Sequence, residues 1–143
     1  MPYIEPGYAN RLFPGDENTR LGQAQYIQGN FGLAEQAYQR AVEVSPQNGA
    51  AWLGLAASYD RLGRFDLADR AYRQARRHLG ETYALLNNEG YSQMLRGNTR
   101  EARRLFNRAL RLAPDNPVIL NNLAVLDSGQ GYFQGTAPVI FPG

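Results

Sequence analysis

The chain has 143 residues, 43% of them hydrophobic and 20% charged, a composition typical of one soluble globular domain. No stretch approaches the roughly 20 consecutive apolar residues of a membrane-spanning helix, and residues 1–5 have neither the basic start nor the apolar core of a secretion signal. The chain contains no cysteine, which excludes disulfides, thiolate metal sites, a cysteine nucleophile and a lipid-bearing cysteine.

Positive charge is concentrated in the middle of the chain, although the net charge is only +2. Residues 1–60 contain three arginines and six acids, residues 61–111 contain twelve and five, and residues 112–143 contain none and two. Every basic side chain is arginine, because the sequence has no lysine. The planar guanidinium group suits carboxylates and phosphates, so this middle segment is a candidate surface for anionic partners.

The first predicted element is an extended tail over residues 1–15, which are rich in glycine and proline and lack helical periodicity. From residue 15 onward, a step of 34 residues relates alanine, aromatic and glycine positions. A period of this length predicts stacked helical units. The members of the series are Ala34, Ala68 and Ala102; Tyr38, Tyr72 and Phe106; Ala41, Ala75 and Ala109; Gly29, Gly63, Gly97 and Gly131; and Pro46, Gly80 and Pro114.

Three such units occupy residues 15–48, 49–82 and 83–116. In each unit the apolar residues recur at helical spacing in two successive stripes, and in the second unit one stripe contains Trp52 and Tyr59 and the next contains Ala68 and Tyr72. The glycine between the stripes, Gly63 in this unit, can adopt the positive φ that ends a helix before a tight return. Each unit is therefore predicted to be an antiparallel helix pair.

The last predicted elements are a capping helix over residues 117–128 and a second extended tail over residues 129–143. We expect Asn121, Asn122, Asp127 and Ser128 to make the outer side of the capping helix polar. Both tails contain apolar side chains that disordered segments usually lack, so we expect at least one tail to pack on the helices. These side chains are Tyr3, Ile4, Tyr8, Leu12 and Phe13 in the first tail, and Tyr132, Phe133, Val139, Ile140 and Phe141 in the second.

These features resemble the tetratricopeptide-repeat (TPR) family, whose 34-residue pattern sets a large residue, Leu-Gly, an aromatic, Gly, Ala, an aromatic, Ala and Pro at fixed places. The unit 49–82 is most similar, with Ala56 in place of a glycine. The other units depart at Asn18, Glu89 and Gln93, which stand at core-type places. The resemblance implies an all-α, right-handed solenoid of three helix pairs plus the capping helix, covering residues 16–128 and acting as a scaffold without catalytic activity.

In the TPR family the first helix of each pair lines a concave groove, which implies that this chain binds a protein or an extended peptide segment there. An asparagine amide offers both the donor and the acceptor that a peptide backbone needs. We expect Asn87 and Asn88, in register with Asn121 and Asn122, to hold a partner's backbone; the alternative is that they follow the repeat consensus and structure helix starts. The implied groove residues are Gln23, Tyr26, Ile27, Leu53, Ala57, Asp60, Arg61, Asn87, Asn88, Tyr91, Met94, Asn121, Asn122 and Val125.

Arginines on the second helices form two stripes that are predicted to lie on the convex outside. They are either a patch for an acidic protein, anionic lipid or nucleic acid, or simply a solvated face. No aromatic residues interleave with them, so we expect no nucleic acid partner. The stripes are Arg70, Arg73 and Arg77, and Arg100, Arg104, Arg108 and Arg111.

No residue is a candidate for catalysis or for holding a metal or cofactor. The sole histidine, His78, is predicted at a helix C-terminus beside Arg76 and Arg77, where cationic side chains are favoured by the helix dipole. No phosphate-binding glycine loop, metal-spaced cluster or nucleophile motif accompanies it.

Residues 51–60, 63–68 and 86–97 are similar to the TadD-type TPR proteins of bacterial tight-adherence (Flp) pilus systems. This narrower resemblance implies a role in pilus or secretion-channel assembly at the outer membrane, although that family's secretion signal and lipid-bearing cysteine are absent here. The alternatives are a cytoplasmic adaptor that binds a regulatory peptide, and a scaffold that self-associates through its tails or solenoid ends. The lysine-dependent groove of chaperone-binding TPR proteins is disfavoured, because the chain has no lysine.

Overall fold

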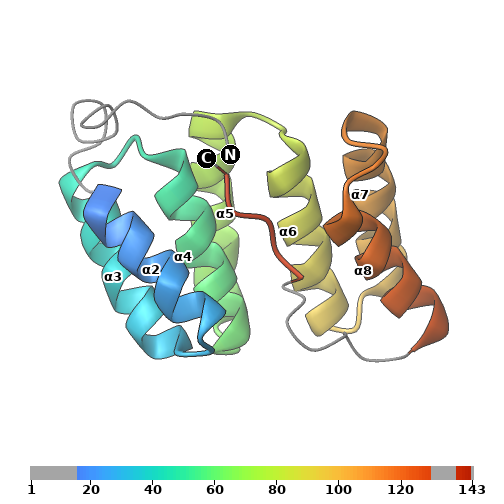
Figure 1. Ribbon diagram of the computed structural model, residues 1–143, viewed down its shortest axis with the longest axis horizontal. Coiled ribbons are helices and arrows are strands. Elements are labelled where there is room, and N and C mark those ends of the chain that lie inside the picture. Colours follow the sequence, from blue (N-terminus) through green and yellow to red (C-terminus); the bar gives the residue numbers. More distant parts are fainter. Residues whose placement is uncertain (1–15, 130–137, 143) are drawn as a thin grey trace. The chain divides into compact units, whose positions relative to one another are not determined.

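The computed structural model describes residues 16–129 and 138–142, and this part of the chain is all-α (Figure 1). The tail over residues 1–15 and the predictions for Gly131, Tyr132 and Phe133 lie outside the described residues. The chain divides into two compact units, residues 1–78 and 79–143. The described helices are α2 (Asp16–Ile27), α3 (Phe31–Val44), α4 (Gly49–Arg61), α5 (Phe65–Leu79), α6 (Tyr83–Leu95), α7 (Thr99–Leu112) and α8 (Pro117–Ser128).

The predicted helix pairs are confirmed, and their ends follow the local sequence. Gly29, Gly63 and Gly97 separate the two helices of each pair and have φ of +85°, +73° and +84°, a conformation that other residues resist. Asn48 and Thr82 cap α4 and α6 by accepting a hydrogen bond from the backbone N–H groups of Ala51 and Leu85.

The first unit is held together by one aromatic ring that packs on two helix backbones. Tyr38 of α3 is only 1% exposed. A methyl group added at Gly22 of α2 would lie 2.8 Å from its ring, and one added at Gly54 of α4 would lie 2.2 Å from it. The ring therefore occupies space that is open only because both facing positions lack a side chain. The same burial raises the pKa of the Tyr38 hydroxyl above its ordinary value.

The second unit repeats this packing with phenylalanine. Phe106 of α7 is fully buried, and a methyl group at Gly90 of α6 would lie 2.7 Å from its ring. Helix α8 also packs against α7 and places Ile119 in the core of this unit. Asn116 caps α8 by accepting hydrogen bonds from the N–H groups of Val118 and Ile119, and Pro117 occupies the first turn. None of the described helices has the length and apolar character needed to cross a bilayer.

Replacing Gly54 with alanine is expected to lower the free energy of unfolding by about 1–3 kcal/mol, because the added methyl group displaces the Tyr38 ring from a closely packed core. Gly32→Ala in α3 is the matched control, since no atom lies within 4 Å of the methyl group it would add. That control is expected to be neutral or stabilising by up to about 1 kcal/mol. Urea unfolding followed by circular dichroism measures both, and equal midpoints for the two variants would contradict the packing argument.

Candidate functional site

Three asparagine side chains from α6 and α8 meet in the second unit, and we call Asn87, Asn88 and Asn122 the asparagine cluster. All three are at most 1% exposed. The Asn122 Nδ2 group donates to Asn87 Oδ1 at 2.8 Å, and Asn87 Nδ2 donates to Asn88 Oδ1 at 3.0 Å. Each amide is thereby oriented by its neighbour. Such a chain of buried amides is stable only when its remaining donors and acceptors also find partners.

Those remaining partners are backbone atoms of the chain's own C-terminal segment. The Pro138 carbonyl accepts hydrogen bonds from Asn122 Nδ2 at 2.8 Å and from Asn87 Nδ2 at 3.0 Å. The Ile140 N–H donates to Asn88 Oδ1 at 2.8 Å, and Asn88 Nδ2 donates to the Ile140 carbonyl at 3.0 Å. Figure 1 shows residues 138–142, in red, beside α6. The segment bends at Pro138 and Val139, and both of these residues are buried.

The asparagine cluster therefore binds the backbone of Pro138 and Ile140. The Pro138 carbonyl oxygen has two lone pairs and accepts from two amides, whereas Ile140 offers both an N–H and a carbonyl to one amide. Asn87 and Asn88 lie in the interior of α6, while Thr82 caps that helix, so they do not structure the helix start. The sequence pattern had singled out both the asparagines and the apolar residues of the second tail, and the structure brings them together.

The other residues expected near the cluster lie around it in different ways. Tyr91 is buried, and Met94 and Val125 are half-buried. Asn87 is hydrogen-bonded to Asn122 and not to Asn121. The side-chain nitrogen of Asn121 has no hydrogen-bond partner among the described residues. The expectation that Asn122 makes the outer side of α8 polar is wrong, because Asn122 is fully buried.

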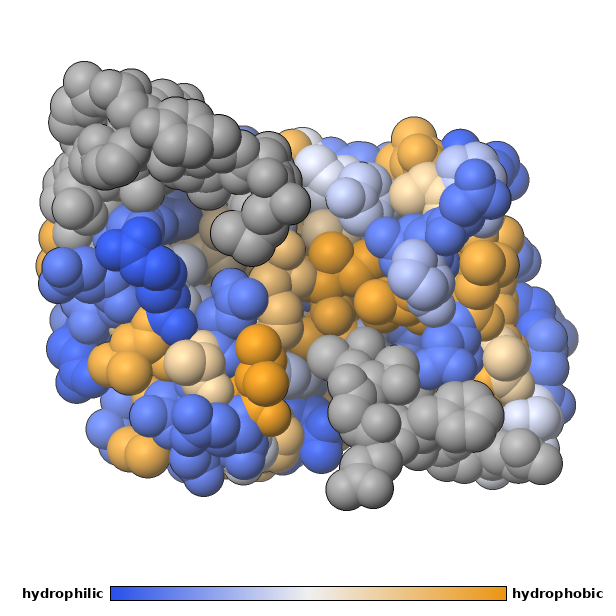
Figure 2. Space-filling model, viewed as in Figure 1, coloured by the Kyte–Doolittle hydropathy of each residue, from blue (hydrophilic) through white to orange (hydrophobic). Residues whose placement is uncertain are grey.

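In the first unit, most of the residues expected to line a groove are buried. Tyr26 packs edge-on against Phe31, with 5.0 Å between the ring centroids, and the Arg61 guanidinium lies 4.4 Å from the centroid of the Phe31 ring. Asp60 is buried and accepts a hydrogen bond from the Tyr72 hydroxyl at 2.6 Å. Leu53 and Ala57 are also buried, Gln23 is half-buried and Ile27 is exposed. Hydrophilic side chains dominate the visible described surface over α2, broken by separate apolar spots (Figure 2).

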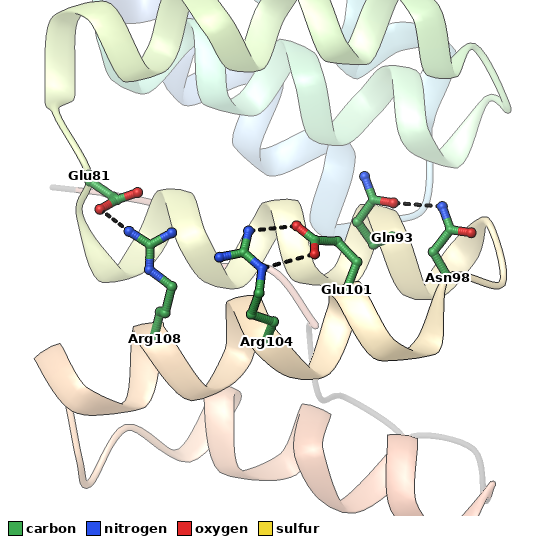
Figure 3. A network of polar contacts seen from close by, with 6 residues as sticks. All are labelled: Glu81, Gln93, Asn98, Glu101, Arg104 and Arg108. Atoms are coloured by element: carbon green, nitrogen blue, oxygen red, sulfur yellow. Dashed lines mark hydrogen bonds and ion pairs between the residues drawn. The ribbon is translucent and has the colours of Figure 1, made fainter.

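The two arginine stripes differ in how they are paired. Arg70, Arg73 and Arg77 are exposed on α5. On α7, Arg104 binds Glu101 through its Nε and a terminal nitrogen at 2.9 and 2.6 Å, and Arg108 pairs with Glu81 (Figure 3). These pairs compensate part of the positive charge of the α7 stripe, whose other members Arg100 and Arg111 are exposed.

His78 is exposed at the end of α5, as expected for a helix C-terminus. Within residues 16–129 and 138–142, no group of three or more histidine, aspartate or glutamate side chains is placed to hold a metal ion.

Replacing Arg104 with glutamine is expected to raise the pKa of Glu101. The hydrogen bond from Arg104 holds that pKa below its ordinary value of 4.5. Because the folded-state pKa is lowered, the pair stabilises the fold above the unfolded-state pKa, and this contribution disappears as the pH falls through the folded value. A carboxyl NMR titration measures the shift, with Arg111→Gln on the same helix as control. An unchanged Glu101 titration in the Arg104 variant would contradict the pairing.

Comparison with known proteins gives one consistent family. Two models described as tetratricopeptide repeat match residues 19–69 and 83–116, together more than half of the chain. This chain is 42% identical over 79 residues to the cytochrome c-type biogenesis protein CycH of Rhizobium meliloti (strain 1021). The matched region covers 52% of this chain and 20% of CycH. The matched regions span 11% to 34% of the lengths of the four curated relatives found.

Solved structures agree with this result. The pilF protein of Pseudomonas aeruginosa superposes with a TM-score of 0.67 at 25% identity, over 79% of this chain and 52% of that one. The second TPR domain of human RPAP3, solved in complex with the HSP70 peptide SGPTIEEVD, superposes with a TM-score of 0.64 at 19% identity, over 80% of this chain and 98% of that one. At this identity the RPAP3 likeness concerns the fold.

Proposed function

We propose that this chain, which belongs to the tetratricopeptide-repeat family, is a non-catalytic scaffold that binds a non-helical segment of a partner protein by that segment's backbone. The observation that carries the proposal is the pairing of Asn88 with Ile140, in which one side-chain amide binds both the N–H and the carbonyl of a single residue. Such pairing is indifferent to the partner's side chain, so it anchors a segment while neighbouring positions select its sequence.

The chemistry of the asparagine cluster favours an uncharged segment. Its four hydrogen bonds to the backbone join neutral groups, each contributing about 0.5–1.5 kcal/mol net. The HSP70 peptide bound by RPAP3 ends in Glu-Glu-Val-Asp, whereas the asparagine cluster consists of neutral amides that carry no charge to offset such an ending. We therefore propose a partner segment that lacks a terminal acidic cluster.

The remaining expected site residues enter the proposal as a wider contact surface. Met94, Asn121 and Val125 are half-buried on the helices that carry the asparagine cluster, and we expect them to contact the partner on either side of the anchored residue. The exposed Arg70, Arg73 and Arg77 would favour a partner with an acidic region elsewhere on its surface.

Asn88→Ala is expected to weaken binding of a partner segment at least about tenfold, because it removes both hydrogen bonds to one residue. Octapeptides selected from a random display library by the full chain serve as probes, and fluorescence anisotropy measures their affinity. Asn107→Ala, at an exposed asparagine on α7, is the matched control.

Circular dichroism shows whether both variants remain folded. Adding Asn122→Ala to Asn88→Ala is expected to weaken binding further. The proposal is refuted if the selected peptides bind the Asn88 variant as tightly as they bind the Asn107 variant.

For the cellular role, we propose assistance in building a bacterial pilus or secretion machine. The support is the resemblance of three stretches to TadD-type proteins, together with the likeness to pilF. The genes beside this one provide the test. Neighbouring genes for pilin and secretin subunits are expected, whereas neighbours belonging to a cytoplasmic signalling pathway would favour the adaptor alternative.

A further inference from the structure

We infer that residues 138–140 are a built-in competitor for the proposed partner, so that binding begins only when this segment leaves the asparagine cluster. The inference rests on the proposed function.

The number of donors shows how strongly the cluster depends on an occupant. Asn87 and Asn122 each have two side-chain N–H groups, one used within the cluster and one used on the Pro138 carbonyl. Asn88 uses an N–H and an oxygen lone pair on Ile140. Removing the segment takes away these partners from three N–H groups and one lone pair. Water or another backbone must then replace these four hydrogen bonds, so a segment that offers the same groups can take the place of residues 138–140.

The occupant is tethered close to the site that it fills. Helix α8 carries Asn122 and ends at Ser128, followed by Gly129 with a left-handed φ of +71°. Residues 130–137 then lead to Pro138, so the connection is short. A short connection gives an effective concentration of the order of millimolar, which a separate partner rarely reaches. The apparent affinity for a partner equals the intrinsic affinity multiplied by the fraction of molecules in which the site is open.

The resident segment also indicates the chemistry of a partner that could replace it. Its first anchored residue, Pro138, needs only a carbonyl, so proline is tolerated there. Its third, Ile140, needs a free N–H as well as a carbonyl. Between them, Val139 is 3% exposed, so the middle position holds a small aliphatic side chain. We therefore expect a partner segment that is bent and uncharged. Its first position accepts proline or another residue, its second position holds a small aliphatic residue, and its third position holds any residue except proline.

Ile140→Pro in the full chain tests the competition, because proline lacks the N–H that binds Asn88. Ile140→Ala keeps the N–H and is the matched control. The probe is a fluorescent octapeptide with the sequence of residues 136–143, added to each protein. We expect the Ile140→Pro protein to bind it at least about tenfold more tightly than the wild type and the Ile140→Ala protein. The side-chain amide NMR signals of Asn87, Asn88 and Asn122 should shift in the proline variant alone and return when the peptide is added.

Equal affinity of the octapeptide for all three proteins would overturn the inference, as would its failure to bind the proline variant. Unshifted amide signals in that variant would overturn it too. In a second octapeptide, proline replaces the isoleucine that corresponds to Ile140. This peptide lacks the N–H that donates to Asn88 Oδ1, so it is expected not to bind the proline variant, and its binding would contradict the inference. These outcomes are separate from the test of the proposed function, because peptides selected from the library can depend on Asn88 whether or not residues 138–140 compete with them.

Discussion

The close packing of an aromatic ring on a bare helix backbone is the interaction on which the architecture depends. Tyr38 lies against the backbones at Gly22 and Gly54, and Phe106 lies against the backbone at Gly90. The rings remove a large apolar area from water and at the same time set how closely the paired helices approach. Because each ring comes from the second helix of its pair, it holds the first helix in a defined rotation. In α6 this rotation places Asn87 within hydrogen-bonding distance of Asn122 in α8.

The asparagine cluster shows how such a scaffold can bind a peptide without charge. A buried amide is costly when it is unpaired and stabilising when every donor and acceptor has a partner. Such a cluster therefore favours a segment whose backbone N–H and carbonyl groups lie in the matching positions. The arginines of α7 behave differently. They lie at the surface, are screened by water and salt, and two of them are already paired with Glu81 and Glu101. We therefore propose that the amides provide short-range recognition and that the exposed arginines favour a partner with an acidic region.

Occupation of the site by the chain's own residues affects how tightly a partner can bind. If residues 138–140 occupy the cluster in the free protein, they must leave before a partner binds, and binding becomes an exchange of one backbone for another. In such an exchange the hydrogen bonds are nearly conserved. The net free energy then comes from what the partner contacts beyond those bonds, which places selectivity in the flanking positions.

The sequence by itself determined the helices, their pairing and the family. The recurrence of alanine, aromatic and glycine positions every 34 residues depends on local periodicity and on the φ of glycine, both of which can be read without coordinates. It also drew attention to the asparagines, because their amide chemistry is a property of the residue type.

Only the tertiary structure decided that Asn122 pairs with Asn87, that Asn121 stays apart, and that Asp60 is held by Tyr72. Which side chains meet depends on helix rotation to within a fraction of a turn, and a repeat of 34 residues does not specify that. Nor could the pattern place Pro138 and Ile140 on the cluster, because a segment without periodicity is positioned by the hydrogen bonds it makes with distant residues.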